Sequence, residues 1–597
     1  MSFKSTLILP VKQAVFTLYG HEFPSEKIQF QETRKEFEGD ITLAVFGLIS
    51  FSKKSAEATA VEIGEYLVAK VPTVEKFNVV KGFLNLSFTT FYWLSEFETI
   101  LTAPNFGFTP ISEASPVVMI EYPSPNTNKP LHLGHLRNIF LGSAISEILK
   151  ATGNKVVHTC LYNDRGTNIS KSMLAWMKWG NGETPETNGI KGDHLVGKYY
   201  VVFSNAYKAE LEQLLASGLV KEEAEKQSKL IKEVNELTVK WENGDTQVRS
   251  LWKQMNDWVY AGFEETYKWL GIKPEKFYYE SDVYNLGKET VQEGLEKGVF
   301  FNKPDGSIWI DLSSDDLDEK VVLRSNGTTV YITQDIAIAN EKERDFKLDK
   351  SIYVVGNEQE YHFKVLFLIL KKLGRSYADN LFHLSYGMVE LPSGKMKSRE
   401  GTVVDADDLI QEMLESAKDK TAEKGKTEGQ SQSDLEELYR IIGMGALRYF
   451  ILKVDPKKKM LFNPAESIET EGHTGPFIQY THARIKSLIR KNDGNEEISK
   501  SLKINETFVL PKELQLIRSL TLFPEVLLEA ANTYNPALVA NYAYELAKEF
   551  NQYYHETPIS KETDLSIREF RICLSSQLAS VINKSMKIIG IDVPERM

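Results

Sequence analysis

The sequence predicts a multidomain α/β protein built around a doubly wound parallel sheet, with a small α+β module before it and an all-α helical bundle after it. Three observations support this prediction. Short alternating apolar runs and turn residues fill the first hundred residues, strand-like runs alternate with helix-length segments through the middle of the chain, and helical spacing dominates after residue 438. The length of 597 residues also exceeds what one hydrophobic core normally holds.

The N-terminal module is predicted to span residues 1–110. Turn signals at Gly39-Asp40 and Gly82 separate its short apolar alternations. Residues 103–116 are rich in proline and glycine, which indicates a linker to the next domain.

The central region, residues 111–410, is predicted to contain the parallel sheet. Its expected strands lie at 117–120, 156–161, 352–356 and 382–386, and its expected helices at 133–151 and 361–373. This alternation of strands and helices is typical of a Rossmann-like core with helices on both faces of the sheet.

Three further segments complete the domain plan. Leucines at helical spacing among many Lys and Glu residues predict a helical insertion over about 181–267. Residues 416–437 have almost no apolar content, so we expect a mobile surface segment there, within a linker region at 411–470. Residues 471–597 are predicted to form the helical bundle.

Composition excludes several classes of protein. Only Cys160 and Cys573 are present and they lie far apart, so a disulfide framework or a thiolate zinc site cannot be built, and a reducing cytoplasm fits best. The first residues are too interrupted by Pro10 and Lys12 for a signal or membrane segment, and nothing later approaches a membrane span. The net charge of -12 argues against a non-specific nucleic-acid binder. The basic run 457–459 is equally compatible with a phosphate contact and with a solvated loop.

The strongest local motif is PNTNKPLHLGH, residues 125–135, where the first strand of the sheet gives way to a helix. This position faces the ligand crevice of an open parallel sheet, and the helix N-terminus offers unpaired N–H groups and a partial positive charge to phosphates. His132 and His135 would add donors one turn apart, and Gly134 would let a nucleotide approach the backbone. The motif alone does not exclude a capped helix with surface histidines.

A second motif, LPSGKMKSREGT at residues 391–402, follows the last expected strand. Lys395, Lys397 and Arg399 place several cations on a loop able to close over a triphosphate. Alone it would be an ordinary basic loop. Because it occurs at the same predicted sheet as the histidine motif, the two motifs together favour a nucleotide-binding site.

Together these motifs resemble the HIGH and KMSKS signatures of class I aminoacyl-tRNA synthetases, spelled HLGH at 132–135 and KMKSR at 395–399. The longer segments IEYPSPNTNKPLHLGHLRN, VYITQDIAIA, IYVVGNEQEYH, EGHTGPFIQYTHARI and the terminal VPERM are similar to the arginyl family. The resemblance runs from the N-terminal module to the last residue, with the motifs in the expected order.

The resemblance implies an arginine-tRNA ligase. Such an enzyme activates L-arginine with ATP, accompanied by Mg²⁺ as part of the substrate complex, and transfers the arginyl group to the terminal adenosine of tRNA(Arg). Neither step needs a protein nucleophile, so catalysis rests on positioning and charge stabilisation. We expect a cytoplasmic monomer with no membrane partner, no tightly bound cofactor and no metal site of its own.

The family resemblance also implies an ATP site. Its expected members are His132, Gly134, His135, Met388, Val389, Lys395 and Lys397. One departure matters, because Ser398 stands where the usual signature has its second lysine. Lys129, just before the histidine motif, resembles the residue thought to substitute; the alternative is a solvated loop lysine.

Arginine presents a planar cation with five donors, so a selective pocket needs a carboxylate in a protected setting. Asp335 in VYITQDIAIA is the leading candidate, in an expected buried environment, with Tyr331 one helical turn before it. The resemblance adds Gln359, a second carboxylate at Glu121, and Asn126 for the substrate's α-amino group or carboxylate. Alternatively, Asp335 caps a helix after residues 333–334.

RNA contacts are expected at both ends of the chain. Phe477, Tyr480 and Arg484 would line one face of a helix, suited to stacking on unpaired bases, although such a stripe is equally compatible with core packing. The resemblance implies an anticodon-binding bundle at 471–597, a stem-contact role for 411–470 and a tRNA-elbow module at the N-terminus. Within these, Phe83, Asn85 and the C-terminal Met597 are further candidate tRNA contacts.

Three rivals remain at this stage. A nucleotidyltransferase with the same histidine motif would have no use for the large C-terminal helical domain. A synthetase for another amino acid is possible, although cysteine is disfavoured because the zinc ligands of such a site are missing. A non-catalytic RNA-binding relative is disfavoured because both ATP motifs are intact. A P-loop at residues 425–427 is excluded because Lys420 stands where its first glycine should be.

Overall fold

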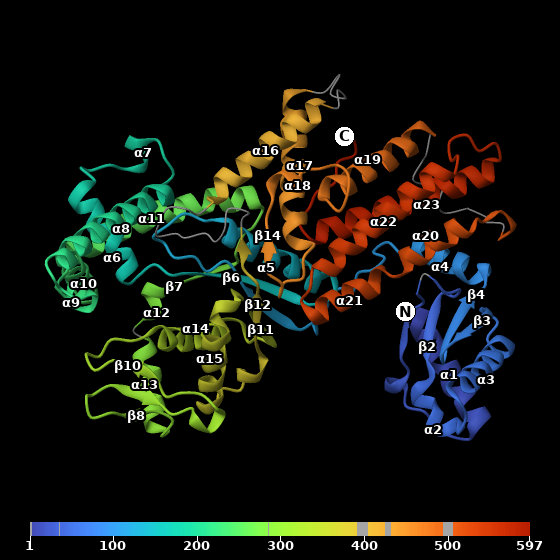
Figure 1. Cartoon of the computed structure of the whole chain (residues 1–597), viewed down its shortest axis with the longest axis horizontal. Coiled ribbons are helices and arrows are strands. Elements are labelled where there is room, and N and C mark those ends of the chain that lie inside the picture. The colour runs from blue at the N-terminus through green and yellow to red at the C-terminus, as the bar shows by residue number, and fades with distance from the viewer. Residues whose placement is uncertain (1–2, 35, 285, 391–403, 424–430, 493–505) are drawn as a thin grey trace.

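The computed structural model describes residues 3–34, 36–284, 286–390, 404–423, 431–492 and 506–597. Figure 1 shows an N-terminal module set to one side of a central sheet, with a helical insertion on the opposite side and long helices above. Within the described residues, no helix combines the length and apolar character needed to cross a membrane.

The N-terminal module is an α+β unit with an antiparallel sheet of strand order β1-β2-β4-β3. Its elements are α1 (Phe3–Tyr19), β1 (Phe30–Glu32), β2 (Ile41–Ala44), α2 (Ile49–Ser52), α3 (Ala56–Lys70), β3 (Val74–Val80), β4 (Phe83–Phe88) and α4 (Thr90–Thr102). Leu84 and Leu86 alternate along β4 and are fully buried, as the period of two in a strand requires. The module meets the rest of the chain where the Arg518 guanidinium lies 3.4 Å from the Asp40 carboxylate.

The central domain contains the predicted parallel sheet, in strand order β12-β11-β5-β6-β7, and every neighbouring pair is parallel. Its strands are β5 (Val117–Glu121), β6 (Lys155–Tyr162), β7 (Lys276–Tyr279), β11 (Lys350–Gly356) and β12 (Leu381–Tyr386). The crossover helices are α5 (Leu133–Ala151), α14 (Tyr331–Phe346) and α15 (Glu360–Lys372). The strand order changes direction at β5, so the loop after β5 lies at the switch point where such sheets bind ligands.

The insertion between β6 and β7 is helical, as predicted, and extends slightly beyond the expected range. It comprises α6 (Thr167–Trp179), α7 (Pro185–Asn188), α8 (Gly192–Ala216), α9 (Lys221–Gln227), α10 (Lys229–Glu242) and α11 (Thr246–Leu270). A small antiparallel sheet that the sequence did not reveal follows β7. It is formed by β8 (Phe301–Asn302), β9 (Ile308–Ile310) and β10 (Lys320–Leu323), after α12 (Glu280–Val283) and α13 (Leu286–Glu296).

The C-terminal part is a helical bundle preceded by two packed helices. The elements are β13 (Val389–Glu390), α16 (Ala406–Glu423), α17 (Gln432–Leu452), β14 (Met460–Leu461), α18 (Pro464–Ser467), α19 (Gly475–Lys491), α20 (Pro511–Thr521), α21 (Phe523–Thr533), α22 (Ala537–Glu556) and α23 (Leu565–Ile588). The fold class predicted from the sequence is confirmed.

The predicted mobile segment at 416–437 is wrong where the structure describes it. Residues 416–423 continue α16, and residues 432–437 begin α17; 424–430 lie outside the described residues. Met413 and Ala417 are fully buried one turn apart, so a narrow apolar stripe holds α16 although its other faces are charged.

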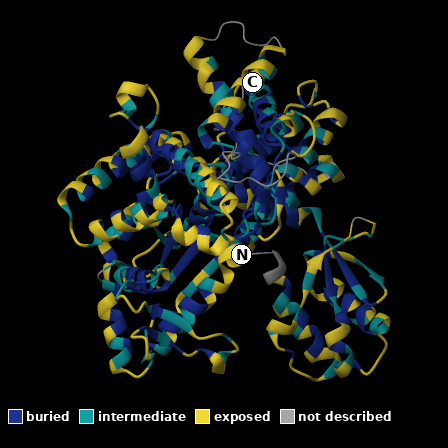
Figure 2. Cartoon of the chain, turned by 60° about the vertical axis from the view of Figure 1, so that its left-hand side comes forward, coloured by how far each residue is buried: buried dark blue, intermediate teal, exposed yellow. Residues whose placement is uncertain are grey.

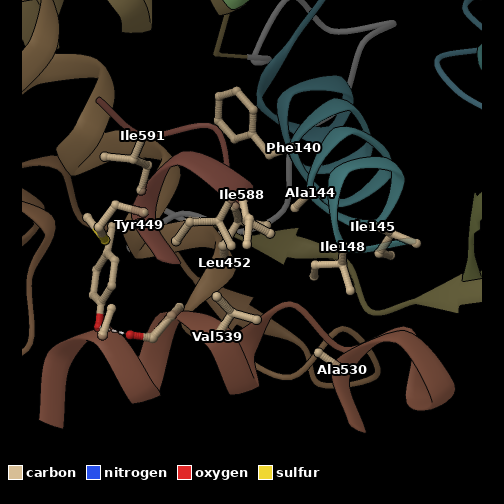
Figure 3. Packing of buried hydrophobic residues seen from close by; sticks show 14 of the residues in the cluster. Phe140, Ala144, Ile145, Ile148, Tyr449, Leu452, Ala530, Val539, Ile588 and Ile591 are labelled. Atoms are coloured by element: carbon tan, nitrogen blue, oxygen red, sulfur yellow. Dashed lines mark hydrogen bonds between the residues drawn. The ribbon is translucent and has the colours of Figure 1, made fainter. Parts of the chain in front are cut away.

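The flank of α5 is packed against the C-terminal helices. Figure 3 shows Ala144 and Ile148 of α5 beside Leu452 of α17 and Ile588 of α23, all buried. Tyr449 of α17 is also buried, and its hydroxyl donates to the Ala540 carbonyl at 3.1 Å. Figure 2 shows the buried segments gathered where the sheet and these helices meet, while the insertion carries many exposed outer faces. The helix that carries the histidine motif is therefore anchored in the bundle.

Candidate active site

A cavity of about 600 Å³ lies at the carboxyl-terminal edge of the parallel sheet. It is walled by the loop after β5, the N-terminus of α5, and the ends of β11, β12 and β13. Its lining includes Ser124, Lys129, His132, Gly134, His135, Asn138, Val355, Glu358, Tyr386, Met388, Val389, Glu390 and Lys459. Five residues expected at the ATP site from the sequence, namely His132, Gly134, His135, Met388 and Val389, thus share one cavity with Lys129.

The two histidines form a capping box at the start of α5. The Gly134 N–H donates to Nδ1 of His132 at 3.1 Å, and the His132 N–H donates to Nδ1 of His135 at 3.1 Å. Because both Nδ1 atoms accept, each neutral ring carries its proton on Nε2. Burial, with Lys129 nearby, lowers the pKa of His132 to about 3. Burial, followed by His132 and Lys129, lowers the pKa of His135 far below its ordinary value, so both rings are neutral N–H donors.

The N-terminal N–H groups of α5 are not free, which corrects the sequence-based expectation. Leu133 N–H donates to the Val404 carbonyl at 3.1 Å, Gly134 N–H to His132, and His135 N–H to the His132 carbonyl at 2.7 Å. These three bonds occupy the donors that a phosphate would otherwise use. The helix therefore contributes its dipole and the two Nε2–H groups rather than bare backbone N–H groups.

The structure gives a local reason for a glycine at position 134. A Cβ at this position would lie 3.0 Å from Cε1 and 3.1 Å from Nδ1 of His132. The missing side chain therefore lets the His132 ring fold back over the helix N-terminus, 3.9 Å from the His135 ring centroid.

Lys129 lies against the cavity rather than in open solvent. Burial lowers the pKa of its ammonium group, and it forms no ion pair with a described residue. A half-buried cation without a counter-charge beside the histidines is available to an anionic ligand. This placement does not fit the alternative of a solvated loop lysine.

Sequence reasoning missed other residues that line the cavity. Asn138, one turn along α5 from the histidines, donates from Nδ2 to the Val354 carbonyl at 2.5 Å and to the Tyr386 hydroxyl at 3.3 Å, tying α5 to two strands. Lys459 of the basic run also lines the cavity. Lys395 and Lys397 lie outside the described residues.

Two of the expected arginine residues, Tyr331 and Asp335, lie in the first two turns of α14. Asp335 accepts from Nε2 of His362 at 2.6 Å, and its side chain is 30% exposed, so it is less buried than expected. The nearby side chains of Ile332, Ile336 and Ile338 in the same motif are buried, whereas the Asp335 carboxylate lies on a side of the helix that solvent reaches. Helix α14 begins at Tyr331 with Val330 as N-cap, so Asp335 lies in the second turn and is not a helix cap. Tyr331 is exposed, one turn before it.

Glu121 is engaged within the protein. It ends β5, is buried, forms an ion pair with the buried Lys342 of α14 and accepts from the Ser124 hydroxyl at 3.2 Å. Burial lowers the pKa of Lys342, but Glu121 and, to a smaller extent, Tyr353 more than offset this and the pKa is raised, so Lys342 keeps its positive charge. Asn126 and Gln359 are exposed and lie in the segments that follow the neighbouring strands β5 and β11. Asp335 is therefore the more accessible of the two expected carboxylates.

Two family models match the chain. The model for tRNA synthetases class I (R), catalytic domain, matches residues 98–463, and the model for the DALR anticodon binding domain matches residues 478–597. The chain belongs to the class I arginyl-tRNA synthetase family.

Relatives in this family match over the whole length. The arginine–tRNA ligase of Bacteroides thetaiotaomicron is 52% identical over 100% of both chains, and that of Parabacteroides distasonis is 53% identical over 97% of both. The structure of Thermus thermophilus arginyl-tRNA synthetase matches with a TM-score of 0.80 at 26% identity over 100% of both chains. The enzyme from Plasmodium falciparum, with a TM-score of 0.77 at 19% identity over 99% of both chains, shares the fold.

The three side chains that were expected to line one face of a helix are found on α19 of this member of the arginyl-tRNA synthetase family. Phe477, Tyr480 and Arg484 are all half-buried and lie along one side of the helix. The Arg484 guanidinium lies 5.0 Å from the Tyr480 ring centroid and pairs with Asn551. Met597 is partly buried against the bundle. These side chains support the bundle, yet Tyr480 and Arg484 keep surface that a nucleic acid can reach.

The two candidate tRNA contacts in the N-terminal module differ in their burial. Asn85 is 2% exposed and its Oδ1 accepts from the Thr42 hydroxyl at 2.6 Å inside the module, so the expected direct contact between Asn85 and RNA does not fit this structure. Phe83 is half-buried, and its ring lies 5.1 Å from that of Phe46, which is 48% exposed. The family resemblance suggested Asn85, but both faces of β4 are largely covered at this position.

Proposed function

We propose that this chain is an arginine–tRNA ligase that activates L-arginine with ATP and transfers it to the 3′-terminal adenosine of tRNA(Arg). The observation that carries the proposal is the cavity where His132, His135 and Lys129 converge at the sheet's switch point, within a chain that matches arginine–tRNA ligases over its full length. The two motifs and the helical bundle agree with this activity.

In the first step the arginine carboxylate attacks the α-phosphate of ATP and pyrophosphate leaves. Negative charge shifts along the phosphates as the bond breaks, so fixed donors and cations stabilise the transition state. His132 and His135 supply Nε2–H donors, Lys129 supplies a cation, and Met388 and Val389 flank the adenine. Lys395 and Lys397 are proposed to add positive charge. Mg²⁺ enters with ATP as substrate, and Glu358 and Glu390 are oxygen donors in the same cavity.

Selection of arginine is assigned chiefly to Asp335. A carboxylate accepts two parallel hydrogen bonds from a guanidinium, and Asp335 is the accessible acid on α14. Tyr331 and Gln359 are proposed to complete the guanidinium site, and Asn126 to hold the α-amino or carboxylate end. Glu121, already paired with Lys342, provides negative potential and holds the end of β5 in place.

In the second step the terminal ribose hydroxyl of tRNA attacks the activated carbonyl and AMP leaves. The bundle at 471–597 is proposed to bind the anticodon stem-loop through Tyr480 and Arg484. Residues 411–470 are proposed to contact the stem of the tRNA, and the module at 1–110 is proposed to contact its elbow. We propose a cytoplasmic monomer. Both cysteines are free and buried, which suits a reducing compartment.

One experiment tests the activity. Total tRNA is incubated with the chain, ATP–Mg²⁺ and each labelled amino acid in turn, and label in acid-precipitable tRNA is counted. We expect arginine alone to be incorporated. Incorporation of a different amino acid, or of none by a folded chain, would contradict the proposal.

A further inference from the structure

A second group of polar side chains lies behind the histidine motif, at the contact between the insertion and α16. His194 is in the first turn of α8, and Asp405 and Asp407 stand at the start of α16. One ligand atom from each residue lies within 4.8 Å of the others. None of these side chains has a part in the proposed activity.

Hydrogen bonding accounts for one of the three ligand atoms, because Asp407 Oδ2 accepts from the Lys191 ammonium group, but it does not account for the position of His194 Nε2. His194 Nε2 is 3.3 Å from Oδ2 of Asp405 and 3.3 Å from Oδ2 of Asp407. A single N–H can point at only one oxygen, and this buried nitrogen makes no hydrogen bond of good geometry with a described residue. Ligands in neighbouring positions on one ion, with bonds of about 2.1 Å, lie about 3.0–3.4 Å apart.

The other oxygen of each aspartate is held separately. Asp405 Oδ1 accepts from the Asp407 N–H at 2.8 Å, which caps α16, and Asp407 Oδ1 accepts from the Thr266 hydroxyl at 2.8 Å. These bonds fix both carboxylates so that their Oδ2 atoms face His194. Partners of this kind orient metal ligands in known sites.

The charges around the group do not balance. Asp193, Asp405 and Asp407 bring three negative charges, and Lys191 brings one positive charge through its contacts with Asp407 and, at 3.5 Å, Asp193. When His194 is neutral, as a metal ligand must be, two negative charges remain. The Asp193 side chain is fully buried, and neither of its oxygens has a hydrogen-bond partner among the described residues. Such burial is costly without a compensating cation.

We propose that His194 Nε2, Asp405 Oδ2 and Asp407 Oδ2 bind one divalent first-row transition-metal ion. One imidazole and two carboxylates suit Mn²⁺ and Zn²⁺, and two positive charges neutralise the group. A separate cavity of about 250 Å³, lined by His194 and Asp405 together with His132, gives the ion a route from solvent. The site is distinct from substrate Mg²⁺ and differs from the sequence-based expectation of no metal site.

The position of this ion gives it a structural role. Asp405 pairs through its backbone with His132 in a β-bridge, and the Ala406 N–H donates to the Leu131 carbonyl at 3.0 Å. An ion bound by α8 and the start of α16 therefore joins the insertion to the segment that adjoins the histidine motif.

The test is a titration of the full chain with Mn²⁺ after chelator treatment, in the absence of ATP, arginine and tRNA. Free Mn²⁺ is followed by electron paramagnetic resonance. We expect one ion per chain, and a ¹⁴N coupling in the pulsed spectrum of bound Mn²⁺. Because no substrate is present, the result is independent of whether the charging assay succeeds.

Two variants and one matched control complete the design. H194Q and D405N should each weaken Mn²⁺ binding by about tenfold or more, and H194Q should abolish the ¹⁴N coupling. Asparagine is itself a good N-cap, so D405N preserves the start of α16. D408N makes the same charge change at the exposed neighbouring residue and should bind like the parent.

The proposal is overturned if the parent chain binds no stoichiometric Mn²⁺, or if H194Q and D405N bind it as tightly as the parent. Circular dichroism checks that each variant is folded. If H194Q does not fold, the comparison of D405N with D408N still decides the question.

Discussion

Replacing Asp335 with asparagine isolates the charge that we assign to arginine selection. The substitution keeps the shape of the side chain and an oxygen that can accept from His362, which now bonds Asp335 at 2.6 Å. It removes only the negative charge facing the substrate guanidinium. Asp335 lies inside the second turn of α14, so no helix cap is lost.

The expected magnitude follows from the exposure of the site. Two unit charges 4 Å apart attract by about 4 kcal/mol at an effective dielectric constant of about 20. Because the Asp335 side chain is 30% exposed, solvent screening reduces this to about 2–3 kcal/mol. That loss corresponds to a KM for arginine raised by about 30- to 150-fold. The KM for ATP should change little, because Asp335 does not line the ATP cavity.

The assay is steady-state charging of tRNA(Arg), with arginine and ATP varied separately. Glu341→Gln is the matched control, because it neutralises another acid of α14, one that pairs with Arg344. A folded Asp335→Asn variant with unchanged KM for arginine would refute the assignment. An equal rise in the Glu341 variant would show that any charge loss on α14 has this effect.

Four further predictions test other parts of the molecule. Lys129→Ala should slow arginine activation by about tenfold or more, measured in a single turnover; an unchanged rate would reduce it to a structural residue. ATP–pyrophosphate exchange with arginine should require cognate tRNA, as the family resemblance implies, and full exchange without tRNA would contradict this. The pKa of His132 is about 3 in the folded chain, below its ordinary value of about 6.5. Between these two pH values only the unfolded chain takes up this proton, so the stability of the fold decreases as the pH drops below about 6.5. His132→Asn should therefore flatten the fall in unfolding temperature between pH 7.5 and 5.5. Glu513→Gln should lower the free energy of unfolding in urea by about 3–5 kcal/mol, since it breaks a buried pair with Arg571, whereas the exposed Glu556→Gln should change it by less than about 1 kcal/mol.

Four of the five strands of the sheet were predictable along the chain, because each is a local apolar run bounded by turn residues, whereas β7 was not predicted. The strand before the histidine motif and the helix over 133–151 were placed correctly from periodicity alone. The position of His132 and His135 at a ligand crevice followed from topology.

Contacts between distant segments were not predictable from one sequence. The capping role of His132 depends on ring geometry, and Val404, which takes the Leu133 N–H, lies far along the chain. The pairing of Glu121 with Lys342 joins residues separated by more than two hundred positions, and no local pattern marks either as a partner. Residues 416–423 were misjudged because two small buried contacts outweighed a charged composition.

The packing of α5 against the bundle affects how this chain can be recombined with its relatives. The two family models divide the chain between residues 463 and 478, which invites an exchange of anticodon domains at that boundary. However, the hydrophobic interior continues across it, from Ala144, Ile148 and Leu452 on one side into Ile588 on the other. A hybrid joined there inherits half of an interface from each parent, and each mismatched methylene costs about 1 kcal/mol. Two parents are therefore compatible when the side chains on the flank of α5 in one fit those on the last helix of the other, whatever the overall identity of the two sequences.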